Sequence, residues 1–258
     1  MPTFPNECID LTVTSPPYDN LRTYKGFVFD FETIARELFR VTKQGGVVVW
    51  VVGDATINGS ETGTSFKQAL YFKEIGFNLH DTMIYKSHKP PLTHNRYEQE
   101  FEYTFILSKG VPKTFNPLKE KTNYAGDLQK KYYNSASSKQ GRAMRQSEKE
   151  TYFVGTEKIK GNIWEYPTGF NGSTTDKIAF QHPAIFPEQL AKDHIYSWSN
   201  EGDTVLDPMC GSGTTPKMAV LMNRNYIGIE IAKEYHSLSV KRVGAYEQQI
   251  NAEFLKAI

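Results

Sequence analysis

A serine, two prolines and a tyrosine stand together at Ser15, Pro16, Pro17 and Tyr18, directly after the apolar run at 9–14. The prolines fix φ and hold the backbone extended, so carbonyl groups here are not used by a β-ladder. The Ser15 hydroxyl and the Pro16 carbonyl could accept hydrogen bonds from an aromatic amine and localise its lone pair for in-line attack. Tyr18 could stack on the same planar ring. The alternative, a polyproline II turn that only ends a strand, stays open on this motif alone.

A glycine-rich turn between a strand pattern at 203–206 and a helix pattern at 214–222 could bind a ligand, because glycine lets a ligand approach the backbone closely. Glu230 follows Gly213 by seventeen residues, at the end of the next apolar run. A carboxylate there can accept hydrogen bonds from both hydroxyls of an adenosine ribose. The combination favours an adenosine cofactor over a purely structural turn. The residues of interest in the turn are Asp207, Pro208, Cys210, Gly211, Ser212, Gly213 and Thr214.

Two features of this turn favour S-adenosylmethionine over a dinucleotide. The third glycine of the dinucleotide fingerprint is missing, because Pro216 occupies that place. Asp207 stands where a pyrophosphate would approach, and a carboxylate repels phosphate but suits a cationic ligand. We therefore expect S-adenosylmethionine as the cofactor.

Alternating strand and helix patterns at both ends of the chain indicate a doubly wound α/β domain with a mostly parallel sheet. The run at 46–52 is apolar throughout, as in a strand that is covered on both faces. Gly45 and Gly46 are expected to end the helix before it. The other expected strands cover 9–14, 82–85, 103–107, 203–206 and 226–230, and the expected helices cover 31–41, 66–75, 187–198 and 214–222.

The middle of the chain, from about 110 to 160, is polar and has no firm periodicity, so it is expected to be an inserted recognition lobe or a mobile loop. Residues 109–160 hold 12 Lys and Arg against 5 Asp and Glu, which gives this stretch a net charge of about +7 and the rest about −6. A basic lobe suits an enzyme that binds a polyanion, although charge alone equally allows an ordinary solvated loop. The serine-rich run at 135–138 predicts mobility in the free protein.

Composition argues against several other classes of protein. The two cysteines form no disulfide framework, and the six histidines show no ligand spacing, so we expect no metal site. No apolar run approaches the roughly 20 residues needed to cross a bilayer. The opening residues lack the pattern of a signal peptide. We expect a cytoplasmic protein that does not contact a membrane.

Taken together, these segments resemble the DNA amino-methyltransferases, which methylate N4 of cytosine or N6 of adenine. Residues 14–18 (TSPPY) resemble the catalytic motif of that family, and residues 207–215 (DPMCGSGTT) resemble its cofactor loop. The catalytic motif comes first, as in the circularly permuted β group. Further segments that resemble the family are 182–190, 102–110 and 162–164.

The resemblance implies a Rossmann-like methyltransferase fold in the permuted order. Residues 1–110 would form the catalytic half, residues 111–160 the target-recognition region and residues 161–258 the cofactor-binding half. S-adenosylmethionine is implied as the methyl donor and double-stranded DNA as the substrate, with lysines and arginines on its phosphates. A homodimer and a cognate restriction endonuclease are left open. Many members carry a further strand, ending in Gly-Asp, before the catalytic strand; this sequence lacks it, which puts one sheet edge in doubt.

The family pattern also implies roles for single residues. Ser15 and the Pro16 carbonyl would hold the target amine, and Tyr18 would stack on a base swung out of the duplex. Gly211 and Gly213 would line the methionine part of the cofactor. Asp207 would lie near the cofactor's amino group, Glu230 would hold the ribose, and Phe186 would pack nearby.

Serine at position 15, rather than aspartate, goes with cytosine N4 in this family, so N4-methylcytosine is the expected product and N6-methyladenine the alternative. Methylation at cytosine C5 is disfavoured, because it needs a cysteine nucleophile. Cys8 precedes the first strand, and Cys210 lies in the cofactor loop. An RNA or protein amine methyltransferase stays open. So does an inactive nucleic-acid-binding or regulatory protein, although the intact motifs argue against it.

Overall fold

The computed structural model describes residues 1–257 except residues 2, 20–28, 88–96 and 135–145. The chain divides into two compact units, one formed by Met1–Asn116 with Asn162–Ile258 and the other by Pro117–Gly161. The predicted boundaries of the middle region were 111 and 160. The serine-rich run at 135–138 lies outside the described residues, so its predicted mobility stays a prediction.

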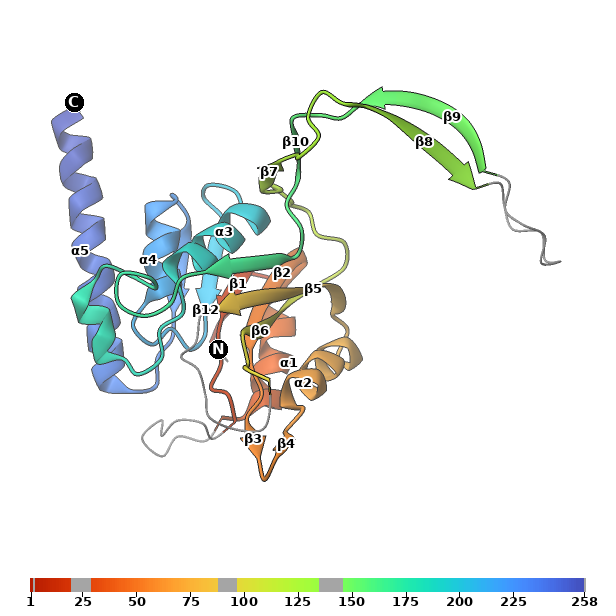
Figure 1. Ribbon diagram of the computed structural model, residues 1–258. Helices are drawn as coiled ribbons and strands as arrows, with labels where there is room; N and C mark the ends of the chain where they lie inside the picture. Colours follow the sequence, from red (N-terminus) through yellow and green to blue (C-terminus); the bar gives the residue numbers. More distant parts are fainter. Residues whose placement is uncertain (2, 20–28, 88–96, 135–145, 258) are drawn as a thin grey trace. The chain divides into compact units, whose positions relative to one another are not determined.

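A seven-stranded sheet lies at the centre of the first unit, in the order β11-β5-β6-β2-β1-β12-β13 (Figure 1). Neighbouring strands are parallel, except that β6 runs antiparallel to both β5 and β2. The predicted mostly parallel α/β sheet is confirmed, and β13 lies at one edge of the described sheet. The strands are β1 (Ile9–Thr14), β2 (Thr42–Val52), β5 (Asn78–Ser87), β6 (Phe101–Ser108), β11 (Ile163–Tyr166), β12 (Thr204–Asp207) and β13 (Asn225–Gly228).

Helices gather in two groups beside the sheet. The helices α1 and α2 lie together near β2, β5 and β6, whereas α3, α4 and α5 lie together near β1, β12 and β13 (Figure 1). A short pair, β3 (Thr56–Ile57) with β4 (Ser60–Glu61), precedes α2. The helices are α1 (Phe31–Val41), α2 (Thr64–Glu74), α3 (Glu188–Trp198), α4 (Thr214–Leu221) and α5 (Lys233–Ala257), with a 3-10 turn at Lys177–Gln181.

The centre of β2 is buried on both faces, as its apolar sequence predicts. Val48, Trp50 and Val52 belong to a core that includes Leu38 of α1 and Phe72 of α2. The alternate residues Val47, Val49 and Val51 point to the opposite face of the sheet and are equally buried. Each fully buried side chain of this size contributes about 1.5–3 kcal/mol. The sheet is therefore a rigid base for the turns that follow its strands.

The predicted role of Gly45 and Gly46 and the predicted end of β13 were wrong. Helix α1 ends at Val41 and the chain passes directly into β2 at Thr42, so Gly45 and Gly46 lie within the strand instead of ending the helix. Glycine is required there for close approach, because a Cβ on Gly46 would lie 2.9 Å from the Asp10 carbonyl oxygen. Strand β13 ends at Gly228, so Glu230 lies in the turn before α5.

The second unit contains strands where no regular structure was predicted. Strand β7 (Lys119–Lys121) pairs antiparallel with β10 (Glu157–Ile159), and β8 (Leu128–Asn134) pairs antiparallel with β9 (Gln146–Phe153). The prediction missed them because β7 and β10 are largely exposed and mostly polar, so they lack the alternation that marks a strand with one buried face.

No helix in the part of the chain that the structure describes is long and apolar enough to cross a bilayer.

Candidate active site

The two motifs meet at the carboxyl ends of adjacent strands. Strand β1 runs parallel to β12, with Thr12 opposite Leu206, so Ser15 and Asp207 emerge at the same edge of the sheet. Such an edge is where α/β sheets bind ligands. Thr14 Oγ1 donates a 2.7 Å hydrogen bond to Asp207 Oδ1 and links the strands that carry the catalytic motif and the cofactor loop.

Asp207 is a buried carboxyl group, only 1% exposed. Burial raises its pKa to about 6, although hydrogen bonds from Thr14 and from the Met209 backbone N–H act in the opposite direction. A cation next to Asp207 would lower this pKa and be bound in return. The amino group of a bound amino acid, as in S-adenosylmethionine, has that charge, so the buried acid fits the predicted cofactor.

Glu230 closes the glycine turn from the other side. Its Oε2 accepts a 2.9 Å hydrogen bond from the Gly211 N–H, and its Oε1 accepts a 2.8 Å bond from the Ala232 N–H. Each carboxylate oxygen has a second lone pair, so both can still accept a bond from a ribose hydroxyl. Glu230 thus fits the predicted ribose contact, and the turn it holds is the predicted cofactor loop.

Gly213 ends the loop in a conformation that favours glycine. It is the N-cap of α4, with φ of 80°, and a Cβ there would lie 2.5 Å from Ser239 Oγ. Thr215 Oγ1 donates to the Val13 carbonyl and fixes the start of α4 to β1. The loop is therefore packed tightly from both sides.

The remaining loop residues and their neighbours have structural contacts. Cys210 is buried, which raises the pKa of its thiol to about 12 and makes it a poor nucleophile. His182 packs edge-on against Tyr235, and its Nδ1 contacts Ala184. Phe186 is half-buried just before α3. Pro208 and Ser212 lie in the loop that leads into α4, and Thr214 is the first residue of that helix.

The catalytic motif is tied to a residue that the sequence did not single out. The Ser15 hydroxyl lies 2.9 Å from Tyr18 Oη, and Tyr18 Oη donates a 2.8 Å bond to Glu102 Oε2 on β6. Burial and then the charge of Glu102 raise the pKa of Tyr18 well above its usual value. The Tyr18 ring lies against Gly53, where a Cβ would sit 3.4 Å from it, and Pro16 is buried while Pro17 is half-buried.

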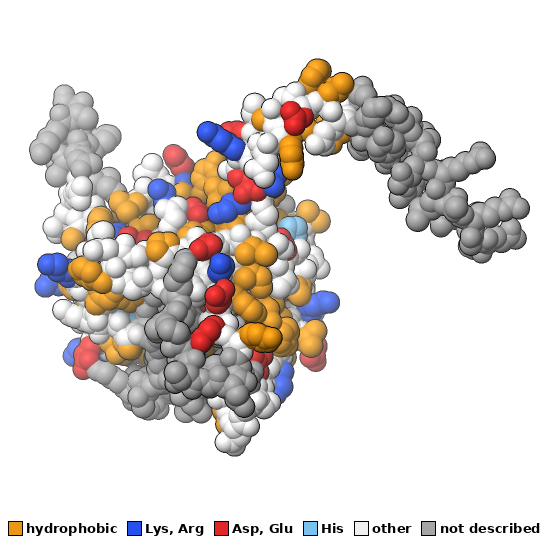
Figure 2. Space-filling model, in the orientation of Figure 1, with side chains coloured by type: hydrophobic (Ala, Val, Ile, Leu, Met, Phe, Trp, Pro, Cys, Tyr) orange, Lys and Arg blue, Asp and Glu red, His pale blue; other side chains and the backbone are white. Residues whose placement is uncertain are grey.

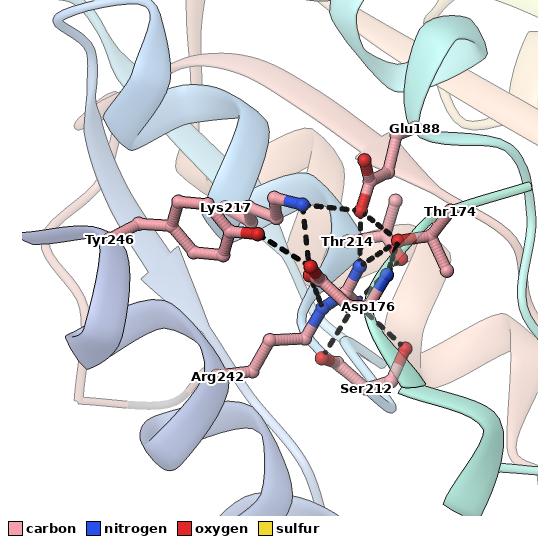
Figure 3. A network of polar contacts seen from close by, with 8 residues as sticks. All are labelled: Thr174, Asp176, Glu188, Ser212, Thr214, Lys217, Arg242 and Tyr246. Atoms are coloured by element: carbon pink, nitrogen blue, oxygen red, sulfur yellow. Dashed lines mark hydrogen bonds and ion pairs between the residues drawn. The ribbon is translucent and has the colours of Figure 1, made fainter. Parts of the chain in front are cut away.

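A buried ion network under the cofactor loop was also missed by the sequence analysis (Figure 3). The side chain of Arg242 on α5 is 1% exposed and donates to Ser212 O at 3.0 Å and to Glu188 Oε1 at 2.5 Å. Lys217 of α4 donates to Asp176 at 2.9 Å and to Glu188 at 2.7 Å. Arg242 Nε also donates to Asp176 at 2.8 Å. The network thus joins α3, α4 and α5 to the loop backbone.

The network favours the ionised form of Asp176. Burial alone would raise the pKa of Asp176, but hydrogen bonds from Lys217, Tyr246 and Arg242 lower it to about 2. The only sequence signal for these contacts was a set of charged residues on otherwise ordinary helices, and none of them is adjacent in sequence to its partner.

The second unit carries exposed charges in pairs. Lys158 lies 3.0 Å from Glu120, and Lys119 lies 3.9 Å from Glu157, across the β7–β10 pair. Basic, acidic and hydrophobic side chains alternate over its described surface (Figure 2). Exposed pairs of this kind contribute about 0–1 kcal/mol each to stability.

Sequence comparison assigns the chain to a family. The sequence profile of the N6/N4-type DNA methylases matches residues 9–241. The chain belongs to this DNA methylase family. It is a DNA methyltransferase of the family whose members methylate N4 or N6 amino groups. Its methyl donor is S-adenosylmethionine.

Individual relatives agree with this family assignment. The chain is 58% identical to the orphan methyltransferase M.BamHII of Bacillus amyloliquefaciens, over 92% of this chain and 89% of the relative. It is 32% identical to the Type II methyltransferase M.MjaI of Methanocaldococcus jannaschii, over 84% of this chain and 68% of the relative. The cytosine-N4-specific PvuII DNA methyltransferase has the same fold, with a TM-score of 0.66, 20% identity and coverage of 93% and 80% of the two chains.

Proposed function

We propose that the chain transfers a methyl group to the exocyclic N4 amine of cytosine in double-stranded DNA, on a base swung out of the duplex, by direct in-line attack. The observation that carries the proposal is the Ser15 hydroxyl at the carboxyl end of β1, next to the cofactor loop. Serine in place of aspartate is the feature that goes with cytosine N4 in this family. The identity of the amine, the flipping of the base and the role of Ser15 are parts of this proposal.

Each residue of the site has its own proposed role. Ser15 Oγ and the Pro16 carbonyl accept hydrogen bonds from the target amine, and the two prolines keep that carbonyl in place. Tyr18 presents its ring to the base. Glu230 holds the ribose of the cofactor, Asp207 attracts its amino group, and the other proposed contacts are Pro208, Cys210, Gly211, Ser212, Gly213, Thr214 and Phe186.

The second unit is the proposed target-recognition region. Its lysines and arginines would bind phosphates, and its polar side chains would contact base edges. A homodimer, a cognate restriction endonuclease that need not touch the chain, and a cytoplasmic location also remain proposals.

N6-methylation of adenine is the second candidate, and one observation favours it. A local match of 40% identity, over 34% of this chain, is to the DNA adenine methyltransferase YhdJ of Escherichia coli K12. Both bases present an exocyclic amine, and the stacking argument applies equally to both.

Product analysis separates the candidates. The purified chain is incubated with S-adenosylmethionine and mixed-sequence DNA, the DNA is digested, and the nucleosides are identified by mass spectrometry. We expect N4-methylcytosine, and loss of that product in a Ser15→Ala variant that still binds the cofactor. N6-methyladenine would keep the enzyme class and contradict the inference from Ser15. No methylated base, despite cofactor binding, would overturn DNA methylation by this chain.

A further inference from the structure

A hydrogen-bonded chain leads from Ser15 to the carboxylate of Glu102. Ser15 Oγ and Tyr18 Oη are 2.9 Å apart, and Tyr18 Oη lies 2.8 Å from Glu102 Oε2. Glu102 belongs to β6, which is separated from β1 by β2 alone. Gly53, just after β2, leaves room for this approach, because a Cβ there would meet the Tyr18 ring at 3.4 Å and Glu102 Cγ at 3.6 Å.

The direction of both hydrogen bonds follows from the number of protons. A tyrosine hydroxyl has one hydrogen, and Tyr18 gives it to Glu102. Ser15 must therefore be the donor to Tyr18, which commits its only hydroxyl hydrogen. The lone pairs of Ser15 Oγ are left to accept, and hydrogen bonds in a chain polarise one another, so Ser15 becomes a stronger acceptor than an isolated serine.

We propose that Glu102 orients Ser15 through Tyr18 and is the final acceptor of the proton that the target amine loses. This inference rests on the proposed function, because it needs an exocyclic amine as the target. When bound, S-adenosylmethionine supplies the methyl group: the N–C bond forms as the S–C bond breaks, the sulfonium becomes a neutral thioether, and the positive charge passes to the amine nitrogen.

The proton that the methylated amine then loses passes along the hydrogen-bonded residues to Glu102. The amine nitrogen gives a proton to Ser15 Oγ, Ser15 gives its own proton to Tyr18 Oη, and Tyr18 gives its proton to Glu102 Oε2. The amine becomes neutral, both hydroxyls are restored, and the carboxylate becomes a carboxylic acid, which then loses its proton to water. Glu102 is thus a positioning residue for Ser15 as well as the proton acceptor.

Tyr18 is suited to a concerted transfer, in which it accepts a proton from Ser15 while it donates its own proton to Glu102. Burial and the Glu102 charge raise its pKa well above the usual value, so a phenolate at this site is disfavoured and Tyr18 does not store negative charge. The nearby acids are engaged elsewhere. Asp54 accepts from Ser65 N at 2.8 Å and from Ser65 Oγ, and Asp207 accepts from Thr14.

Replacing Glu102 by glutamine tests the proposal with little change in shape. The amide oxygen can still accept from Tyr18, but it is a very weak base. We expect the single-turnover methylation rate of Glu102→Gln to fall about 100-fold, the usual size of a general-base contribution. Glu100→Gln, at an exposed site two residues earlier, is the matched control and should keep the rate of the parent enzyme.

A second measurement needs neither cofactor nor DNA. The ultraviolet titration of tyrosinate, taken as the difference between each protein and its Tyr18→Phe counterpart, reports Tyr18 alone. Because the Glu102 charge raises the pKa of Tyr18, Glu102→Gln should lower this pKa, whereas Glu100→Gln should not. Tyr18→Phe itself should lower the methylation rate at least as much as Glu102→Gln.

The outcomes separate this inference from the proposed function. If the parent enzyme forms no methylated base, the proposed function fails. If the parent methylates DNA and Glu102→Gln matches it in rate, the proton transfer to Glu102 is wrong and the proposed function stands. If Glu102→Gln loses rate but leaves the pKa of Tyr18 unchanged, Glu102 does not act through Tyr18, and this inference is overturned.

Discussion

Thr14 Oγ1 lies 2.7 Å from Asp207 Oδ1, although the two residues are 193 positions apart. Thr14 is the last residue of the catalytic-motif strand, and Asp207 is the last residue of the cofactor strand. The bond fixes the relative position of the turns that follow them. The same bond stabilises the Asp207 carboxylate, although burial still raises its pKa to about 6. The ionised Asp207 carboxylate therefore lowers the folding stability of the free protein, and this effect can be measured.

Asp207→Asn should stabilise the free protein at neutral pH. The pKa of Asp207 is raised from 3.8 to about 6 on folding, so its contribution to stability is present below about pH 4 and is lost as the pH rises through 6. A shift of about two pKa units corresponds to about 3 kcal/mol. Urea unfolding at pH 7 should show the variant more stable by about that amount. The difference should vanish below pH 4.

The same variant should bind S-adenosylmethionine more weakly, since the negative charge proposed to attract its amino group is lost. Asp127→Asn, at an exposed position in the second unit, is the control and should change neither property. Equal stabilities of the parent and Asp207→Asn at both pH 4 and pH 7 would show that burial of the ionised Asp207 carboxylate does not destabilise the protein.

Arg242→Met should destabilise the chain and weaken cofactor binding together. Removing one partner of a buried ion pair leaves the others uncompensated and costs about 3–5 kcal/mol. Arg242 also holds the Ser212 carbonyl at 3.0 Å, so its loss should loosen the cofactor loop (Figure 3). Urea unfolding and titration with S-adenosylmethionine measure the two effects.

Lys241→Met provides the control for that experiment, because Lys241 is the exposed neighbour of Arg242 on the same helix. It should leave unfolding and affinity within the error of the measurements. A stable Arg242→Met variant with unchanged affinity would show that the network does not support the loop.

DNA binding should depend steeply on salt if the middle region contacts phosphates. About six such contacts give a slope of log K against log salt near −5. Replacing Lys119, Lys121 and Lys158 by glutamine should make the slope shallower by about 3, at roughly 0.9 per contact. Lys73→Gln, on the exposed side of α2, should leave it unchanged. A flat response in the parent protein would remove the middle region from the DNA interface.

The parts of the fold that could be predicted from sequence are those with local signals. The apolar run from Val47 to Val52 identifies a strand buried on both faces, and the glycine turn after Asp207 lies between a strand and a helix, as its sequence predicts. The β7–β10 pair could not be found, because a largely exposed, mostly polar strand has no alternation of apolar residues. The start of β2 was misplaced because glycine permits both a helix end and a close approach within a strand.

The contacts of Glu102 and Arg242 could not be predicted, for a different reason. Glu102 meets Tyr18 across 84 positions, and Arg242 meets Asp176 across 66. No local pattern marks either partner, because a charged residue on a strand or helix is usually solvent-exposed. Only the packing of β6 near β1, and of α5 under the loop, makes these charges part of the site.

Gly213→Ala should reduce both stability and affinity for S-adenosylmethionine. The change introduces two penalties: a Cβ at φ of 80°, and a contact of 2.5 Å with Ser239 Oγ. Gly202→Ala has nearly the same φ of 82°, but nothing lies within 4 Å of the added Cβ. Both variants should lose about 1 kcal/mol from the backbone conformation. Gly213→Ala should lose about 1–3 kcal/mol more from overpacking. Calorimetric titration with S-adenosylmethionine should show weaker binding for Gly213→Ala alone. Equal stabilities and affinities of the two variants would contradict the tight packing of the loop against α5.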